Sequence, residues 1–252
     1  MTNVLGIDIG GTGIKGAPVD PSTGQLTADR FRIPTPQPAT PTAVAKIVGE
    51  VAAHFEWKST DPVGATFPAV IKAGVAYTAA NVDKKWIGTN AGKLFGDEIG
   101  APVTVVNDAD AAGVAEMEFG AGKGVAGVVI MVTLGTGIGS AVFVDGDLVP
   151  NTELGHMKIG KKDAEKLAAE SVREAEQLTW KQWAERLDNY FDMLERLFSP
   201  DLLIVGGGVS KKADKFLPLL SSASRVVPAQ LLNEAGIVGA AINATKVTPA
   251  AG

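Results

Sequence analysis

Short apolar runs that end in glycine or in polar residues recur along the chain and predict buried strands. The first run covers residues 4–9, is rich in β-branched side chains and is interrupted by Asp8. A carboxylate inside a core strand is costly unless a positive or hydrogen-bonding group meets it. We expect a magnesium ion with its water shell to be that partner of Asp8. Further strands are predicted over residues 63–70, 102–106, 128–134 and 202–205.

Helical periodicity separates these runs. Apolar residues at helical spacing predict a helix over residues 42–55 and a longer one over 180–198, with a capping box at Thr179 and Gln182. Strands that alternate with helices indicate an α/β fold. Shorter helices are expected over residues 94–99, 109–119, 161–171, from 211 onward behind a Ser210 cap, and 233–241.

Glycine residues directly follow the first strand. The spacing of Gly11, Gly13 and Gly16 matches a dinucleotide-binding fingerprint, which requires a helix after the turn. Pro18 disfavours that helix and favours a second strand over residues 14–19. A P-loop is excluded because no Gly-Lys-Ser/Thr triplet follows. The segment therefore predicts a hairpin whose turn can present backbone N–H groups to a phosphate.

The same pattern recurs in the second half of the chain. An apolar run over residues 128–134, a turn at 135–137 and a second apolar run over 138–144 repeat the first hairpin. A single glycine turn is more often an ordinary tight hairpin. Two copies with the same flanks favour a phosphate-binding role and imply two similar lobes.

Composition limits the class of protein. The chain has 252 residues, enough for one large domain or two modest lobes, and its lack of cysteine excludes disulfides and thiolate metal sites. A formal net charge of −5 argues against nonspecific nucleic-acid binding. No apolar segment has the length of a signal peptide or a membrane span. We expect a cytoplasmic protein with no nucleic-acid or membrane partner.

Asn107 and Asp108 are the first candidates for chemistry. They come directly after the strand at residues 102–106, where ligands gather in open α/β sheets. Asp108 could instead cap the following helix, a common role that stabilises by ~1 kcal/mol. The two roles are compatible, and the adjacent Asn and the paired phosphate turns favour chemistry.

Three other polar or glycine-rich segments are candidates. Asn81, Lys84 and Lys85 could bind a polar anionic ligand or belong to a solvated surface. Glu153 and His156 could bind a polyhydroxylated substrate or a metal, and metal is the weaker choice because the chain has two histidines and no cysteine. Finally, glycines at 206–208 follow a strand and permit close approach to an adenine ring or a phosphate chain.

Together these segments resemble the sugar kinases of the ROK (repressor, ORF, kinase) group in the actin/hexokinase/Hsp70 superfamily. The motifs occur in the family's order and span almost the whole chain. The first and second phosphate motifs are matched by residues 8–12 and 134–137, the adenosine motif by 206–208, and the two connecting segments by 107–108 and 235–236.

The resemblance implies an α/β fold of two ribonuclease-H-like (actin-like ATPase) lobes with a cleft between them. Residues 1–108 are expected to form the N-terminal lobe, joined by the C-terminal helix at 237–252. Residues 109–236 are expected to form the C-terminal lobe.

One difference from the usual ROK sequence indicates which members of the group the chain resembles. The motif at residues 153–156 is present, but the cysteine-rich zinc loop that usually follows it in the group is missing. A short, cysteine-free chain with this motif is similar to the polyphosphate-using glucokinases of the group, some of which also use ATP or accept mannose. Glu165 matches the glutamate that follows the missing loop.

The resemblance implies phosphoryl transfer from polyphosphate, and from ATP, to the 6-hydroxyl of glucose, with mannose as a further acceptor. The alternative is a strictly ATP-dependent kinase of the ROK type acting on another hexose. Asp108 is the expected catalytic base, which contributes ~10²–10⁴ in rate. The expected hexose ligands are Asn107, Glu153, His156, Glu165 and Asn81.

The residues expected at the donor are the polar and glycine residues of the phosphate and adenosine motifs. They are Asp8, Gly10, Gly11, Thr12, Gly13, Lys15, Thr133, Gly135, Thr136, Gly137, Gly207 and Gly208, and Asp8 also positions Mg²⁺ through water. Candidates for a long polyphosphate chain are Lys84, Lys85, Lys161 and Lys162. The protein is expected to be a monomer or a homodimer.

Rival classes are disfavoured by what they require. A repressor of the same superfamily needs a DNA-binding extension ahead of the first strand, and a chaperone-like ATPase needs a large substrate-binding appendage. A nicotinamide dehydrogenase needs the helix that Pro18 disfavours.

Overall fold

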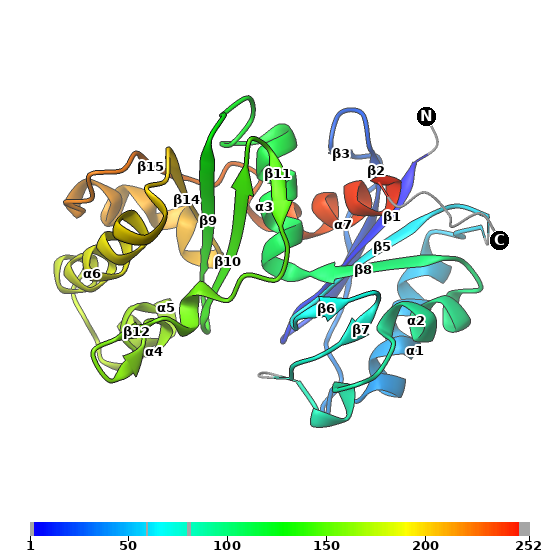
Figure 1. Cartoon of the computed structure of the whole chain (residues 1–252). Helices are drawn as coiled ribbons and strands as arrows, with labels where there is room; N and C mark the ends of the chain where they lie inside the picture. The colour runs from blue at the N-terminus through cyan, green and yellow to red at the C-terminus, as the bar shows by residue number, and fades with distance from the viewer. Residues whose placement is uncertain (1–2, 59, 80–81, 247–252) are drawn as a thin grey trace. The chain divides into compact units, whose positions relative to one another are not determined.

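The computed structural model describes residues 3–58, 60–79 and 82–246, and it divides into two compact units (Figure 1). Unit 1 comprises Met1–Ala115 and Glu234–Gly252, and unit 2 comprises Glu116–Asn233. The division falls inside helix α3, Asp108–Phe119, whereas the lobe boundary expected from the sequence coincides with the start of that helix.

Unit 1 contains a mixed sheet with the strand order β3-β2-β1-β5-β8, and β4 also pairs with β2. β1 forms an antiparallel hairpin with β2 and lies parallel to β5, which in turn lies parallel to β8. The strands of this sheet are β1 (Val4–Ile9), β2 (Ile14–Asp20), β3 (Gln25–Leu26), β4 (Phe31–Ile33), β5 (Val63–Phe67) and β8 (Val103–Asn107).

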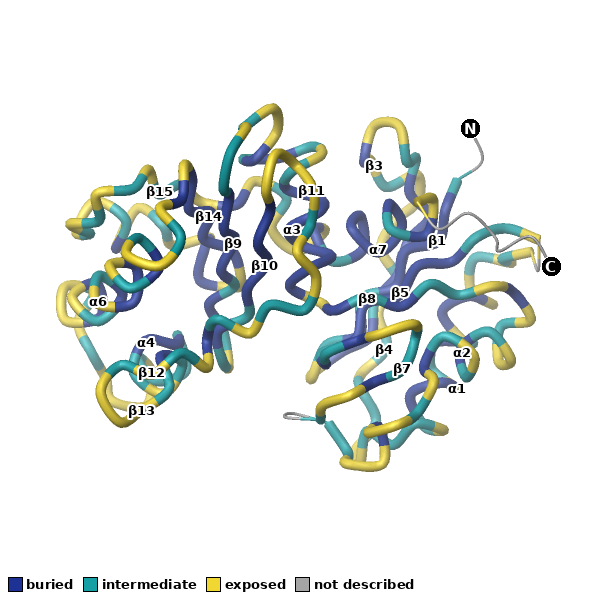
Figure 2. The backbone as a smooth tube through the Cα atoms, viewed as in Figure 1, coloured by how far each residue is buried: buried dark blue, intermediate teal, exposed yellow. Residues whose placement is uncertain are grey.

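Helices cover both faces of the unit 1 sheet. α1 (Pro41–His54) and α2 (Ala91–Ile99) share an apolar core with the face that carries Ile7 and Ile9. α7 (Ala235–Lys246) packs on the opposite face so closely that a side chain at Gly6 or Gly64 would collide with its backbone. Figure 2 shows β1, β5 and α7 as almost wholly buried. The small residues of this helix permit the contact.

Unit 2 repeats the same plan with the strand order β11-β10-β9-β14-β15. β9 forms an antiparallel hairpin with β10 and lies parallel to β14. The long helix α6 (Trp180–Phe198) buries its apolar stripe against this sheet and begins at the predicted capping box. The strands are β9 (Val128–Leu134), β10 (Ile138–Val144), β11 (Asp147–Val149), β14 (Leu202–Gly206) and β15 (Val226–Pro228).

The remaining elements are short. They are β6 (Ile71–Lys72), β7 (Val75–Ala76), η1 (Lys84–Trp86), η2 (Leu154–His156), β12 (Lys158–Ile159), β13 (Lys162–Asp163), α4 (Glu165–Ala168), α5 (Glu170–Ala175), η3 (Gly208–Lys215), η4 (Leu217–Leu219) and η5 (Leu232–Glu234). In the part of the chain that the structure describes, no helix is long and apolar enough to cross a membrane.

Two helices expected from the sequence are wrong. Residues 161–171 contain β13 and two short helices, because Gly160 with φ +62° turns the chain into a small hairpin before Glu165. Ser210 does not cap a helix at Lys211. It lies within the 3₁₀ segment η3, where its hydroxyl donates to the carbonyl of Gly207 at 2.7 Å.

Candidate donor and acceptor sites

The first glycine turn joins β1 to β2 and is closed by a hydrogen bond from Gly10 N to Gly13 O of 3.1 Å. Two further carbonyls, those of Gly10 and Thr12, are bonded from outside the turn. The Thr35 hydroxyl donates to Gly10 O at 2.5 Å, and the Arg32 guanidinium donates to Thr12 O at 2.7 Å. Within the described residues the N–H groups of Gly11 and Thr12 have no protein acceptor. The carbonyls of Gly10, Thr12 and Gly13 are therefore occupied, and the N–H groups of Gly11 and Thr12 are available to an anion.

The second glycine turn, between β9 and β10, is one residue shorter than the first and is also closed by a hydrogen bond within the turn. Gly135 N donates to Gly137 O at 3.1 Å. The backbone N–H of Ser171 donates to Gly135 O at 3.0 Å, and the Ser171 hydroxyl donates to Thr136 O at 2.7 Å. Sequence reasoning missed Ser171, Thr35 and Arg32.

A row of polar side chains crosses unit 1 directly beside the first turn. Asp8 pairs with Lys15 across the hairpin, and Lys15 pairs with Arg32 on β4, so the three side chains project from one face. Lys15 Nζ lies 2.9 Å from Asp8 Oδ2, and Thr66 on β5 donates to Asp8 Oδ1 at 2.8 Å. The row is thus Thr66, Asp8, Lys15, Arg32.

Asp8 also lies at the first turn of α7. A Cβ atom on Gly236 would be 2.7 Å from Asp8 Cγ, so only glycine leaves room for the carboxylate there. The partial positive charge of a helix N-terminus stabilises a carboxylate in this position. The partners of Asp8 are therefore Lys15, Thr66 and this helix end, whereas the sequence predicted a magnesium ion.

No group of three or more acidic or histidine side chains among the described residues could hold a metal by itself. Mg²⁺ commonly binds through one or two carboxylates, several waters and the phosphates of the substrate. Asp8, half-buried beside a turn suited to phosphate, fits that ligand set.

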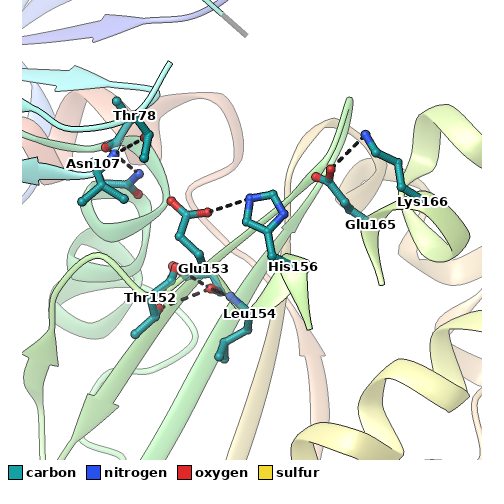
Figure 3. A network of polar contacts seen from close by, with 11 residues as sticks. Thr78, Asn107, Thr152, Glu153, Leu154, His156, Glu165 and Lys166 are labelled. Carbon is teal, nitrogen blue, oxygen red and sulfur yellow. Dashed lines mark hydrogen bonds and ion pairs between the residues drawn. The ribbon is translucent and has the colours of Figure 1, made fainter. Parts of the chain in front are cut away.

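Asn107 and Asp108 mark the end of β8 and the start of α3. Asn107 Oδ1 accepts the N–H groups of Ala109 at 2.8 Å and Asp110 at 3.1 Å. The Nδ2 atom of the same side chain, which Figure 3 shows, donates to the carbonyl of Ala69 at 3.1 Å. The capping role therefore falls on Asn107. Asp108 Oδ1 accepts the Ala109 N–H at 2.9 Å, and its residue is exposed. Asn107 fixes the backbone that presents the Asp108 carboxylate.

A cavity of about 160 Å³ lies in unit 1 at the carboxyl ends of β1 and β5. The backbone of Gly10 and Gly11 lines one wall, and Phe67 forms an apolar wall. Thr35 and Asp83 contribute polar groups. An apolar cavity with a few polar groups at this end of parallel strands is typical of a small-ligand site.

In unit 2, Glu153 and His156 lie on one tight turn, and their side chains face each other (Figure 3). Glu153 Oε2 is 3.7 Å from His156 Nε2. Burial raises the pKa of Glu153 above its ordinary value of 4.5, the charge of Glu165 raises it further, and His156 opposes the shift. Ser140 Oγ accepts the N–H of Leu154 at 2.9 Å and so anchors this turn to β10.

Glu165 stands between the acceptor candidates and the second glycine turn of unit 2. Its Oε2 would be 2.5 Å from a Cβ on Gly137, and its Oε1 is 3.0 Å from Lys166 Nζ. Gly207, with φ +84°, packs against the backbone of Leu134 at the start of the same turn. Unit 2 thus brings together Glu153, His156, Glu165, the second turn and the glycines after β14.

The remaining candidates are four lysines and Asn81. Lys84 and Lys85 are exposed on η1, and Lys161 and Lys162 are exposed near β13. Asn81 lies outside the described residues.

Known proteins resemble this chain over nearly its whole length. The ROK family model matches residues 4–166. A polyphosphate glucokinase of Mycobacterium tuberculosis is 55% identical over 239 residues, which are 94% of this chain and 89% of that protein.

Two solved structures share the fold. The inorganic polyphosphate/ATP-glucomannokinase of Arthrobacter sp. strain KM superposes with a TM-score of 0.91 at 54% identity and covers 97% of this chain and 99% of its own. A ROK family glucokinase of Streptomyces griseus, in complex with glucose and AMPPNP, superposes with a TM-score of 0.81 at 25% identity. The match covers 97% of this chain and 100% of that one. The actin-like ATPase fold predicted from the sequence is therefore confirmed, and the chain belongs to the ROK family.

Proposed function

We propose that this protein is a glucokinase that transfers the terminal phosphoryl group of inorganic polyphosphate, or of ATP, to the 6-hydroxyl of glucose. The observation that carries the proposal is the placement of Asp108 and the first glycine turn. β1, β5 and β8 are parallel, so the turn after β1 and Asp108 after β8 lie at the same edge of one sheet. Two relatives at 54–55% identity have polyphosphate in their names, and this supports polyphosphate as the phosphoryl donor.

In the proposed reaction the 6-hydroxyl oxygen attacks the terminal phosphorus of the donor, and the bridging P–O bond to the rest of the donor breaks. Asp108 accepts the hydroxyl proton, and Asn107 holds the backbone that positions it. We assign the ring hydroxyls to Glu153, His156 and Glu165, together with Asn107 and Asn81.

The two glycine turns bind the donor phosphates through backbone N–H groups. Gly207 and Gly208 border the second turn and are assigned to the nucleotide when ATP is the donor. Asp8 is assigned to Mg²⁺ through water, and the ion supplies charge neutralisation on the donor phosphates. For the distant part of a long polyphosphate chain we keep the exposed lysines Lys84, Lys85, Lys161 and Lys162.

The test is hexose 6-phosphate formation from glucose with polyphosphate and with ATP in parallel. Asp108→Asn is expected to lower kcat by ~10²–10⁴ with either donor, because an amide accepts no proton at neutral pH. Glu118→Gln, an exposed change on the same helix, is the control and leaves kcat unchanged. Transfer from ATP alone would remove the polyphosphate part of the proposal. Full activity of Asp108→Asn would remove the assigned base.

Mannose serves as the second acceptor in the same assay. The Arthrobacter structure is named a glucomannokinase, and that supports mannose as a substrate here. Mannose and glucose differ in the direction of one hydroxyl. Comparable kcat/KM values for the two sugars would therefore mean that no buried group forms a hydrogen bond specific to that hydroxyl.

A further inference from the structure

Arg32 is a cation beside the donor turn with no role in the assignments above. It is exposed on the short edge strand β4, and its guanidinium lies against the first glycine turn. Besides the 2.7 Å bond to Thr12 O, its Cζ would be 2.6 Å from a Cβ on Gly13. The side chain therefore reaches back over the turn that we assign to donor phosphates.

The charge of Arg32 is not balanced locally. Within the described residues, no acidic side chain forms an ion pair with Arg32, and its hydrogen-bond partner is a neutral carbonyl. The neighbouring cation, Lys15, is 2.9 Å from Asp8 Oδ2. Across the row of Asp8, Lys15 and Arg32, one positive charge is in excess, and it lies on the Arg32 side.

The order of the strands places Arg32 relative to the expected base. Asp108 follows β8, so the phosphoryl group that is transferred is expected on the β8 and β5 side of the first turn. β1, β2 and β4 follow in that order across the sheet, which places Arg32 on the other side of this turn from Asp108. Neighbouring strands are about 4.8 Å apart, which places the backbone of Arg32 about 10 Å beyond that of Asp8.

We infer that Arg32 binds a phosphate unit of the polyphosphate chain behind the one that is transferred, and so favours polyphosphate over ATP. A guanidinium can donate two hydrogen bonds to one phosphate. In ATP a nucleoside, which we assign to Gly207 and Gly208, follows the triphosphate, whereas a polyphosphate has further phosphate units that can bind Arg32. The inference rests on the proposed function and adds a residue that distinguishes its two donors.

Steady-state kinetics with glucose, long-chain sodium polyphosphate, sodium tripolyphosphate and ATP test the role of Arg32. Arg32→Gln is expected to raise the KM for long-chain polyphosphate about 10- to 100-fold, the size of a lost charge-assisted hydrogen bond, and to change the KM for ATP about twofold or less. Arg32→Lys should recover part of the polyphosphate affinity, because it keeps the charge. Arg30→Gln, an exposed arginine two residues away, is the matched control.

The outcomes separate this role from a purely structural one. Equal losses with both donors would mean that Arg32 only holds the Thr12 carbonyl, and would overturn the inference, as would unchanged polyphosphate kinetics. Calorimetric binding of tripolyphosphate to the wild type and to Arg32→Gln gives a readout that does not depend on turnover. A wild-type protein that binds polyphosphate at Arg32 but does not transfer from it would contradict the proposed function and leave the Arg32 site standing.

Discussion

The two glycine turns share a backbone plan and differ in the charges around them. Each follows a central strand, closes with a hydrogen bond inside the turn and has two carbonyls bonded from another segment. In unit 1 the second-last residue of the leading strand is Asp8, which pairs with Lys15. In unit 2 the same register position is Thr133, which pairs with Gly139.

The neighbouring strand shows the same contrast. Asp8 receives a hydrogen bond from Thr66 on β5, whereas Thr133 lies opposite Gly206 on β14. Among the described residues, this row of charged side chains lies beside the first turn, and the matching positions of unit 2 carry no charge. A repeated hairpin is enough to hold phosphate oxygens, but binding a metal and stabilising the charge that develops in the reaction require ionisable groups. Under the proposed function, we therefore expect the first turn to contact the reacting end of the donor and the second to contribute backbone contacts.

Among the changes that test this contrast, the largest effect is expected from replacing Asp8 and its counterpart Thr133 separately. Asp8→Asn keeps the shape and the contact with Thr66 but removes the charge that faces Lys15 and, in our proposal, hydrated Mg²⁺. Loss of such an outer partner of a metal typically costs about 10- to 100-fold in affinity or activity. Thr133→Val removes only a neutral hydroxyl, so a fall of about twofold to tenfold in kcat/KM is expected.

The measurement is kcat/KM over a series of Mg²⁺ concentrations with either donor. The Mg²⁺ concentration for half-maximal activity should rise in Asp8→Asn and stay unchanged in Thr133→Val. Equal effects in the two variants would mean that the charged row does not set the first turn apart.

Glycine to alanine changes in the two turns give the second-largest effect. A Cβ on Gly11 or Gly135 would have no protein atom within 4 Å, and neither residue has a positive φ, so the fold tolerates both changes. Any loss must then come from the donor. We expect about a tenfold rise in the donor KM for each variant, because a methyl group keeps phosphate oxygens from the backbone N–H groups.

Thermal unfolding accompanies these kinetics, and Tm should stay within about 2 °C of the wild type. A normal donor KM in Gly135→Ala beside a raised one in Gly11→Ala would restrict donor binding to unit 1.

The sequence predicted the turns but not the groups that hold their carbonyls. Apolar runs and glycines are local signals, so both hairpins followed from the chain itself. Arg32 is separated from Thr12 by 20 positions in the sequence, and Ser171 is separated from Thr136 by 35. No sequence periodicity predicts contacts between such distant positions. The predicted helix over residues 161–171 is wrong because Gly160 adopts a left-handed conformation and turns the chain into the β12–β13 hairpin. Local helix propensity does not predict this turn.

The candidate site shows the same limit. Asn107 and Asp108 were recognised from their place after a strand, but which of them caps α3 depends on the backbone direction at the junction. Asp8 was recognised as a buried carboxylate, but its partners Lys15 and Thr66 become evident only from strand pairing.

The carbonyl contacts themselves give a third, smaller effect. Thr35→Val removes the bond to Gly10 O, and Ser171→Ala removes the hydroxyl bond to Thr136 O while keeping the backbone bond to Gly135 O. Each change should lower the free energy of unfolding by about 1 kcal/mol. Donor KM should rise about threefold for Thr35→Val and less for Ser171→Ala, which retains one of its two contacts.

Denaturant unfolding and donor kinetics measure the two effects side by side. Destabilisation without a change in donor KM would show that the turns keep their N–H groups in place without these bonds.

The smallest expected effect concerns the titration of Glu153, one of the ionisable groups in the cluster of unit 2. Burial raises the pKa of Glu153 in the folded protein above the ordinary 4.5. The folded state therefore keeps its proton to a higher pH than the unfolded chain, and the contribution of Glu153 to stability falls as pH rises from 4.5 to the raised pKa. Below that window the contribution does not change, because both states are protonated.

Glu153→Gln removes this titration. The Tm of the wild type minus that of Glu153→Gln should fall as pH rises through the window and then level off. Because the Glu153 side chain is 39% exposed, the slope is expected to be small. Glucose affinity should change in the opposite sense, since the ionised carboxylate is the better acceptor of a sugar hydroxyl. The wild-type KM for glucose should fall as pH rises above 4.5, and that of Glu153→Gln should stay flat. A difference in Tm that grows with pH would mean that Glu153 is stabilised as a carboxylate, and unit 2 would then carry a charged group comparable to Asp8.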